Sequence, residues 1–167
     1  MILKIIPQPY TDPQCVYNLM KYILKDKSFT YRYERNTYSG SPNILDIDRA
    51  ADEFMMIKDC YGKRGGRQLR HIVIAPEPKD LFTAGMLYEL ALYVCEYYSD
   101  RYQICYSVHT DKRNLHLHIV MNSVSYIDGR MIHDTLKEQA QFRKYCKECY
   151  NRIKAQYAWV KPQLKSF

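Results

Sequence analysis

Two apolar runs, Ile104 to Val108 and Leu115 to Ser125, are separated by a short polar segment from Thr110 to Asn114. Apolar runs of this length that contain several β-branched residues are typical of strands. We therefore expect the two runs to pair as antiparallel neighbours across the polar segment. This hairpin constrains the fold more than any other feature, because it commits the chain to an antiparallel sheet.

Three of the five histidines, His109, His116 and His118, lie at this hairpin. Alternate residues of a strand point to the same face, so His116 and His118 project together, and pairing of the two runs brings His109 opposite them. Three converging imidazoles make a metal site with open coordination positions. The alternative is a solvated hairpin with incidental histidines. The third histidine and the nearby Asp111 favour the metal site.

Composition indicates one domain over residues 1–167, with 47% hydrophobic and 26% charged residues. The net charge of +7 favours a polyanionic partner. Seventeen tyrosines, some interleaved with arginine as in Tyr31 to Arg35, suit stacking on unpaired bases, although many will pack in the core.

The six cysteines show no metal or redox spacing. No signal peptide or membrane span is visible, so we expect a cytoplasmic protein.

Strands and helices are predicted in mixed order along the chain. The predicted strands are Ile2–Ile6, Leu69–Ala75, Tyr102–Val108, Leu115–Ser125 and Arg130–His133. The predicted helices are Asp12–Lys25, Asp46–Cys60, Asp80–Tyr98 and Thr135–Tyr157, with Phe29–Tyr38 as a strand or ordered loop and Ser39–Asn43 as a turn. Because the two types do not strictly alternate, the pattern favours an α+β fold: a central antiparallel sheet of about five strands with flanking helices.

A basic, glycine-rich segment, Tyr61 to Arg67, can approach a phosphate backbone closely. It lacks P-loop spacing, so it is not a nucleotide motif. We expect Lys63, Arg64, Arg67 and the following Arg70 to contact the phosphates of a nucleic acid. A flexible connection between elements is the alternative.

Three segments of the chain resemble the motifs of the MobA/VirD2-like relaxases, which are strand-transfer nucleases of the HUH class. Val108 to Arg130 is similar to the third motif, Lys21 to Lys27 to the first, and Gly66 to Ala75 to the second, in the same order along the chain. The resemblance covers at least Ile2 to about His133. Asn114 stands where some relatives carry another histidine, and the chain is shorter than many relaxases.

The resemblance implies a palm-like sheet and a transesterification at a DNA phosphodiester. Tyr22 is the expected nucleophile; it attacks phosphorus, releases the 3′-oxygen of the neighbouring nucleotide and forms a 5′-phosphotyrosine link. A divalent cation on His109, His116 and His118 would stabilise the phosphate charge. Mn²⁺ or Mg²⁺ is expected, and Zn²⁺, Ni²⁺ or Co²⁺ also suits three imidazoles.

Further residues are assigned supporting roles. Asp111 lies two positions after His109 and can accept the tyrosine proton or orient a histidine, and an exposed turn aspartate is the equally open alternative. His71 and Glu77 are weaker candidates for contact with the metal ligands. Lys21 and Lys25, which flank Tyr22, are expected to neutralise DNA phosphates.

The implied partner is single-stranded or hairpin DNA at the transfer origin of a plasmid or integrative conjugative element in a bacterium, with accessory relaxosome proteins and a coupling protein as possible further partners. Two alternatives remain open. A replication initiator or transposase of the HUH class would use a tyrosine of the last helix, Tyr145 or Tyr150. A non-catalytic module would bind single-stranded DNA without cleaving it.

Overall fold

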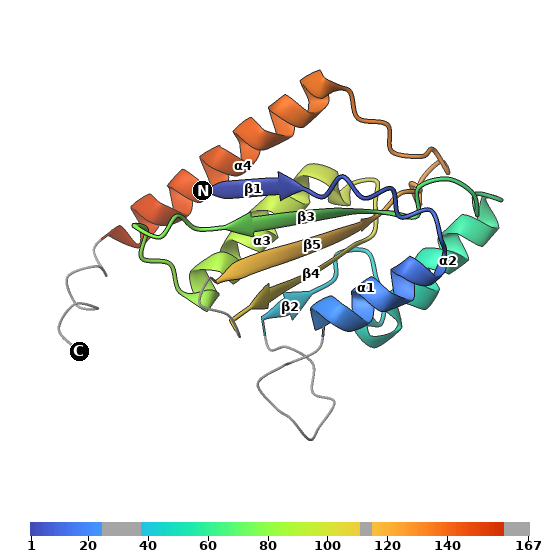
Figure 1. The fold of residues 1–167 in the computed structure, drawn as a ribbon, viewed down its shortest axis with the longest axis horizontal. Coiled ribbons are helices and arrows are strands. Elements are labelled where there is room, and N and C mark those ends of the chain that lie inside the picture. Colours follow the sequence, from blue (N-terminus) through green and yellow to red (C-terminus); the bar gives the residue numbers. More distant parts are fainter. Residues whose placement is uncertain (25–37, 111–114, 159–167) are drawn as a thin grey trace.

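The computed structural model describes residues 1–24, 38–110 and 115–158. Within them the chain forms one antiparallel sheet with helices on both faces (Figure 1), which confirms the expected α+β class. The strands are β1 (Ile2–Ile5), β2 (Ser39–Gly40), β3 (Leu69–Ala75), β4 (Ile104–His109) and β5 (His116–Asn122). The helices are α1 (Gln14–Leu24), α2 (Ala50–Cys60), α3 (Ala84–Ser99) and α4 (Leu136–Gln156), with a 3-10 turn, η1 (Ile47–Arg49), before α2.

The sheet has the strand order β1-β3-β5-β4-β2, and every neighbouring pair is antiparallel. β5 therefore lies at the centre, between β3 and β4. The predicted hairpin is β4 and β5, and its register sets His109 directly opposite His116 and Ser107 opposite His118. Because side chains alternate along a strand, this register determines which histidines share a face.

The two faces of the sheet bury two separate apolar clusters. Ile72, Leu117 and Ile119 face α3 and α4 in the larger cluster. Leu69 and Val120 face α1 and α2 in the smaller one. The even-numbered positions of β5 thus point toward α1 and α2. His116 and His118 belong to this second face, because they alternate in phase with Val120.

Several predicted boundaries differ from the structure. α3 begins at Ala84 rather than Asp80, because Thr83 is its N-cap and accepts from the amide of Met86, while Asp80 accepts instead from Tyr150 and Lys154. Part of the predicted turn is β2, where Gly40 packs over the ring of Tyr106, too close for a side chain there. Phe29 to Tyr38 lies outside the described residues except at its last position.

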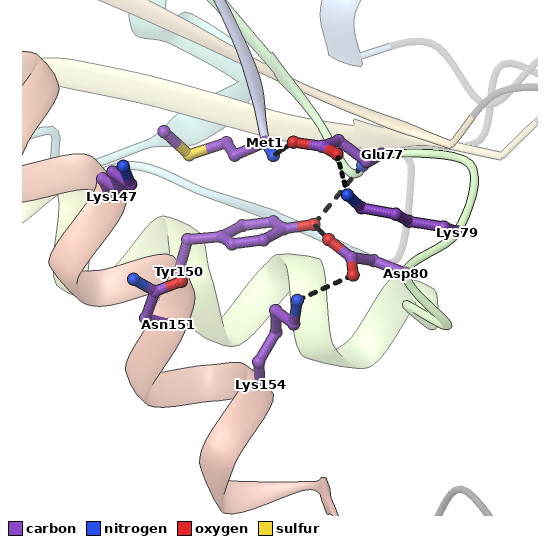
Figure 2. Close-up of a pocket in the computed structure, with 8 residues that line it drawn as sticks. All are labelled: Met1, Glu77, Lys79, Asp80, Lys147, Tyr150, Asn151 and Lys154. Atoms are coloured by element: carbon purple, nitrogen blue, oxygen red, sulfur yellow. Dashed lines mark hydrogen bonds and ion pairs between the residues drawn. The ribbon is translucent and has the colours of Figure 1, made fainter.

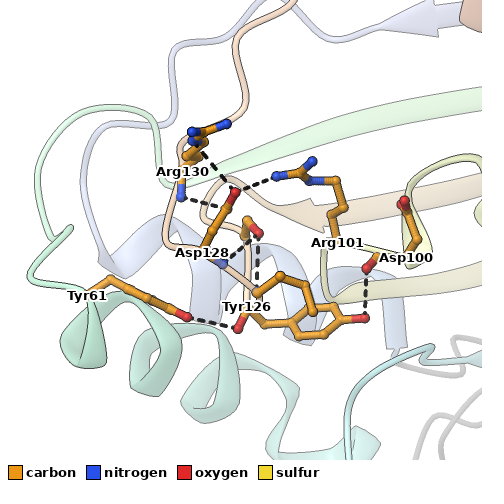
Figure 3. A network of polar contacts seen from close by, with 8 residues as sticks. Tyr61, Asp100, Arg101, Tyr126, Asp128 and Arg130 are labelled. Atoms are coloured by element: carbon orange, nitrogen blue, oxygen red, sulfur yellow. Dashed lines mark hydrogen bonds and ion pairs between the residues drawn. The ribbon is translucent and has the colours of Figure 1, made fainter.

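The predicted strand Arg130–His133 is wrong, since the structure has only a single bridge there, between Val124 and Met131. A polar network fixes the preceding turn instead (Figure 3). Asp128 accepts from Arg101 and from the amide of Arg130, and Gly129 adopts a φ of 68°. A positive φ of this size favours glycine, because glycine has no Cβ that would clash with the backbone.

No helix in the part of the chain that the structure describes is long and apolar enough to cross a membrane.

Candidate active site and metal centre

The three histidines of the hairpin converge at one end of the sheet. The ring centroids of His109 and His118 lie 4.5 Å apart, and His116 lies 5.2 Å from His109 and 4.8 Å from His118. One ring nitrogen from each lies within 4.8 Å of the others. His109 and His118 are buried and His116 is half-buried. The three imidazoles therefore form a group that can hold one metal ion and that solvent or substrate reaches from the His116 side.

The hydrogen bond of His109 indicates which of its nitrogens faces the other two rings. Its Nε2 lies 2.9 Å from the carbonyl oxygen of Ile23, in the last turn of α1. A carbonyl oxygen can only accept, so Nε2–H donates to it. The lone pair of His109 is then on Nδ1, the nitrogen that a cation would use. A backbone hydrogen bond of this kind fixes the tautomer and the ring orientation of a metal ligand.

The same helix end carries Tyr22 over the histidines. The centroid of its ring lies 5.5 Å from that of His109 and 5.4 Å from that of His118, both in edge contacts. Tyr22 is 38% exposed, whereas Val16, Met20 and Ile23 on the same helix pack into the core. Tyr22 therefore combines contact with the three histidines with access to a ligand from solvent.

Two further rings extend from His118 on the β3 side of β5. His71 Nε2 lies 2.8 Å from His118 Nδ1, and the Tyr10 hydroxyl lies 3.0 Å from His71 Nδ1. His71 comes from β3, on the same face as His118. Burial, followed by the nearby His109, lowers the pKa of His71 to about 4, so its ring is neutral near pH 7.

Of the other residues expected at the site, Lys21 is exposed on α1 beside Tyr22. Asp111 and Lys25 lie outside the described residues.

The basic, glycine-rich segment from Tyr61 to Arg67, which we call the basic loop, lies away from the histidines. Its residues from Tyr61 to Gly66 are exposed and Arg67 is half-buried. Gln68 Nε2 donates to the carbonyl oxygens of Arg64 and Gly66, which holds the loop to the sheet. The loop leads into Leu69, which pairs with Asn122 at the far end of β5 from His116. At about 3.4 Å per residue, roughly 20 Å of strand separates the two ends.

Arg70 does not lie on the DNA-facing surface that we expected for it. Strand alternation turns it to the face opposite His71, where its side chain is 3% exposed and forms an ion pair with Asp134. Burial lowers its pKa, and contact with Tyr98 opposes that shift. Arg70 thus connects β3 to the segment before α4, and its buried guanidinium is not available to DNA.

Glu77 lies beyond the end of β3, where its carboxylate contacts Met1 and Lys79. It accepts from the amino group of Met1 at 2.6 Å and pairs with Lys79 at 3.2 Å (Figure 2), and these two contacts lower its pKa. The carboxylate lines a cavity of about 300 Å³ together with Tyr150 and Lys154. Its ion pairs involve the β1 edge of the sheet, whereas the three histidines lie on β4 and β5.

The two tyrosines of α4 lie on the other side of the sheet from the histidines. Tyr145 donates to the carbonyl of Tyr93 at 2.9 Å. Tyr150 is 2% exposed, stacks on Phe82 and donates to Asp80. Their hydroxyls are engaged in the packing of α4, so this geometry does not favour the mechanism in which the last helix supplies the nucleophile.

Sequence reasoning missed Tyr10 and Gln68. Gln68 lies in the segment similar to the second motif but was given no role, and Tyr10 lies outside all three motifs. Tyr10 follows Pro9 in a loop, and only the paired strands show that this loop passes behind His71.

Comparisons with known proteins agree with this architecture. The family profile described as "Relaxase: MobA/VirD2-like, nuclease domain" matches residues 22–154. Two proteins named "Protein rlx" from Staphylococcus aureus are 30% identical over 118 residues and 29% identical over 111 residues, covering 71% and 66% of this chain. These alignments cover 36% and 35% of the relatives, so the chain spans about a third of their length.

A solved structure described as "Molecular Basis of Vancomycin Resistance Transfer in Staphylococcus aureus" has the same fold. Its TM-score is 0.64 at 15% identity, and the alignment covers 93% of this chain and 94% of that one. The family match extends from Tyr22 to Lys154, so it includes the C-terminal end of α1, the histidine hairpin and most of α4. This chain belongs to the MobA/VirD2-like relaxase nuclease-domain family.

Proposed function

We propose that the chain is the nuclease domain of a mobilisation relaxase, a site- and strand-specific DNA nickase and strand transferase that uses Tyr22 as its nucleophile. The observation that carries the proposal is the position of Tyr22, in edge contact with both His109 and His118 and still 38% exposed. A nucleophile must reach both the substrate and the groups that stabilise the phosphate charge. Among the tyrosines of the described residues, Tyr22 has ring contacts with this pair of histidines.

The proposed reaction is a transesterification. The phenolic oxygen of Tyr22 forms a bond to phosphorus, and the bond from phosphorus to the 3′-oxygen of the neighbouring nucleotide breaks. The tyrosine proton passes to a general base and the departing 3′-oxygen is protonated, so charge balances. Asp111 remains our candidate for the base. The product is a 5′-phosphotyrosine link that a 3′-hydroxyl can later attack to restore the strand.

The donor set fits a divalent cation. His109, His116 and His118 would hold it, through three neutral imidazole nitrogens that approach a common point. When bound, such a cation acts as a Lewis acid on the non-bridging phosphate oxygens. Mn²⁺ or Mg²⁺ is our first expectation, with Zn²⁺, Ni²⁺ and Co²⁺ as alternatives.

The metal proposal predicts that His116→Ala loses Mn²⁺ binding while the protein stays folded. His116 is the half-buried member of the group, so its removal disturbs the core least. Titration calorimetry should show one Mn²⁺ per wild-type chain and none for the variant. His133→Ala is the matched control, because His133 is exposed and lies outside the hairpin. Unchanged Mn²⁺ affinity in His116→Ala would contradict the site.

Single-stranded DNA, from an origin segment flanked by a hairpin, is the proposed partner. We propose that it crosses the sheet between Lys21 near the histidines and the basic loop at the opposite end, where Lys63, Arg64 and Arg67 contact phosphates. Arg64 already pairs with Asp59, so its contribution to DNA binding would be the smallest of the three. The separation of about 20 Å implies that several nucleotides lie between the two ends.

This path predicts a strong salt dependence of DNA affinity. The logarithm of the association constant should fall with the logarithm of salt by about 0.7 for each phosphate contact. Lys63→Ala should reduce that slope by about 0.7, as one contact is lost. Fluorescence anisotropy with a single-stranded oligonucleotide measures both. Lys144→Ala, on the exposed surface of α4, is the control and should leave the slope unchanged. A slope near zero would exclude the path.

Residues 1–167 would form one nuclease domain of a protein encoded by a plasmid or an integrative conjugative element, acting in the bacterial cytoplasm. Accessory relaxosome proteins and a coupling protein would be its protein partners in conjugation.

A denaturing gel separates the enzyme from a binding module. The protein is incubated with Mn²⁺ and a pool of labelled single-stranded oligonucleotides, and the mixture is then denatured. A labelled band that stays with the protein supports the relaxase. A salt-sensitive shift on a native gel with no denaturant-resistant band would indicate a non-catalytic DNA-binding protein.

A further inference from the structure

Three rings form a hydrogen-bonded row that ends on a candidate metal ligand. The Tyr10 hydroxyl, the two nitrogens of His71 and Nδ1 of His118 are linked by contacts of 3.0 and 2.8 Å. The planes of the His71 and His118 rings lie within 25° of each other with their centroids 5.1 Å apart, and Tyr10 meets His71 edge-on at 6.2 Å. His71 and His118 are 7% and 5% exposed. Bulk water therefore has little opportunity to replace these hydrogen bonds.

The row determines where its protons lie. If His118 offers Nε2 to a cation, its remaining hydrogen is on Nδ1 and points at His71. The contact between the two rings accommodates one hydrogen, so His71 Nε2 must accept. The hydrogen of His71 is then on Nδ1 and donates to the oxygen of Tyr10. Without Tyr10, nothing in this row would favour the His71 tautomer that accepts from His118.

The backbone of Tyr10 is held in an unusual conformation that aims its side chain at His71. Its φ is 47°, in the left-handed region that non-glycine residues rarely adopt. Such a conformation persists only where surrounding contacts enforce it. The amide of Gln68 supplies one of them, donating to the Tyr10 carbonyl at 2.7 Å.

We infer that Tyr10 is a positioning residue for the metal centre, which acts through His71 to hold His118 in the tautomer and orientation that present Nε2 to a divalent cation. The inference rests on the proposed metal site. It adds a residue outside the histidine hairpin and outside the motifs, from a loop that the family match does not reach. Groups that hydrogen-bond to a metal-bound histidine commonly change metal affinity by about 10–100-fold when they are removed.

The test is Tyr10→Phe, which keeps the ring and removes only the hydroxyl. We expect its Mn²⁺ affinity, measured by titration calorimetry, to fall by about tenfold. Tyr17→Phe is the matched control: it also removes a hydroxyl that donates to another side chain, Asp52, but away from the histidines. Its Mn²⁺ affinity should equal that of wild type. Equal affinities in Tyr10→Phe and wild type would overturn the inference.

A second measurement separates this inference from the metal site itself. Nitrogen-15 NMR of the histidine rings in metal-free protein reports the tautomer of each ring. We expect His118 to carry its hydrogen on Nδ1 in wild type and in Tyr17→Phe, and to become a mixture of tautomers in Tyr10→Phe. If wild type binds no Mn²⁺, the metal proposal fails while this readout still tests Tyr10. An unchanged His118 spectrum in Tyr10→Phe would show that Tyr10 does not control the ring.

Discussion

Tyr22→Phe is expected to abolish strand cleavage while leaving the fold and DNA binding nearly intact. Removal of a covalent nucleophile commonly lowers the rate by roughly four to six orders of magnitude. The stability cost should be small, because Tyr22 is 38% exposed and a hydroxyl at such a site contributes about 1 kcal/mol or less. Cleavage of a labelled oligonucleotide, measured beside thermal unfolding and DNA anisotropy, separates these effects.

Two control variants make the result specific to Tyr22. Tyr17→Phe alters the same helix at a similarly exposed tyrosine, and Tyr145→Phe alters the candidate nucleophile of α4. Both should cleave at close to the wild-type rate. Loss of cleavage in Tyr145→Phe together with full activity in Tyr22→Phe would favour a replication initiator over a relaxase.

Asp134→Ala is expected to lower the free energy of unfolding by about 3–5 kcal/mol. The variant leaves the guanidinium of Arg70 buried without its carboxylate, in a site where both side chains are at most 5% exposed. Desolvation of that charge is the physical cause, since burial already lowers the pKa of Arg70. Denaturant unfolding followed by circular dichroism measures the loss.

The control for this prediction is a pair of the same type on the surface. Lys144 and Glu148 form an i,i+4 pair on α4 with side chains 80% and 63% exposed. Glu148→Ala should therefore change the free energy of unfolding by about 0.5 kcal/mol or less. Equal losses in Asp134→Ala and Glu148→Ala would mean that burial of the Arg70 pair has no energetic consequence.

Local patterns in the sequence were sufficient for most of the fold. The apolar runs around Thr110 to Asn114 predicted the central hairpin, and alternation along the second run predicted that His116 and His118 share a face. These inferences succeed because pairing and alternation depend on residues close in the chain. The order of the strands in the sheet depends on contacts between distant segments, and the sequence pattern did not predict it.

At the candidate site too, contacts between residues distant in the chain could not be predicted from local patterns. Arg70 was expected to bind DNA from its charge and from its place after a basic loop. Its partner Asp134 is 64 positions later in the chain, and only the folded structure shows that the two are buried together. The contact of Tyr22 with His118 likewise depends on how α1 docks on the sheet, where the Ile23 carbonyl meets His109. No spacing in the sequence encodes that contact.

The central claim, that Tyr22 forms a covalent link to DNA, is tested most directly by locating the link. Wild-type protein is incubated with Mn²⁺ and a pool of single-stranded oligonucleotides, denatured, and digested with nuclease and trypsin. Mass spectrometry of the recovered peptides is expected to show a nucleotide adduct on the peptide that begins at Tyr22, because trypsin cleaves after Lys21. An adduct on Tyr145, Tyr150 or any other residue would contradict the account.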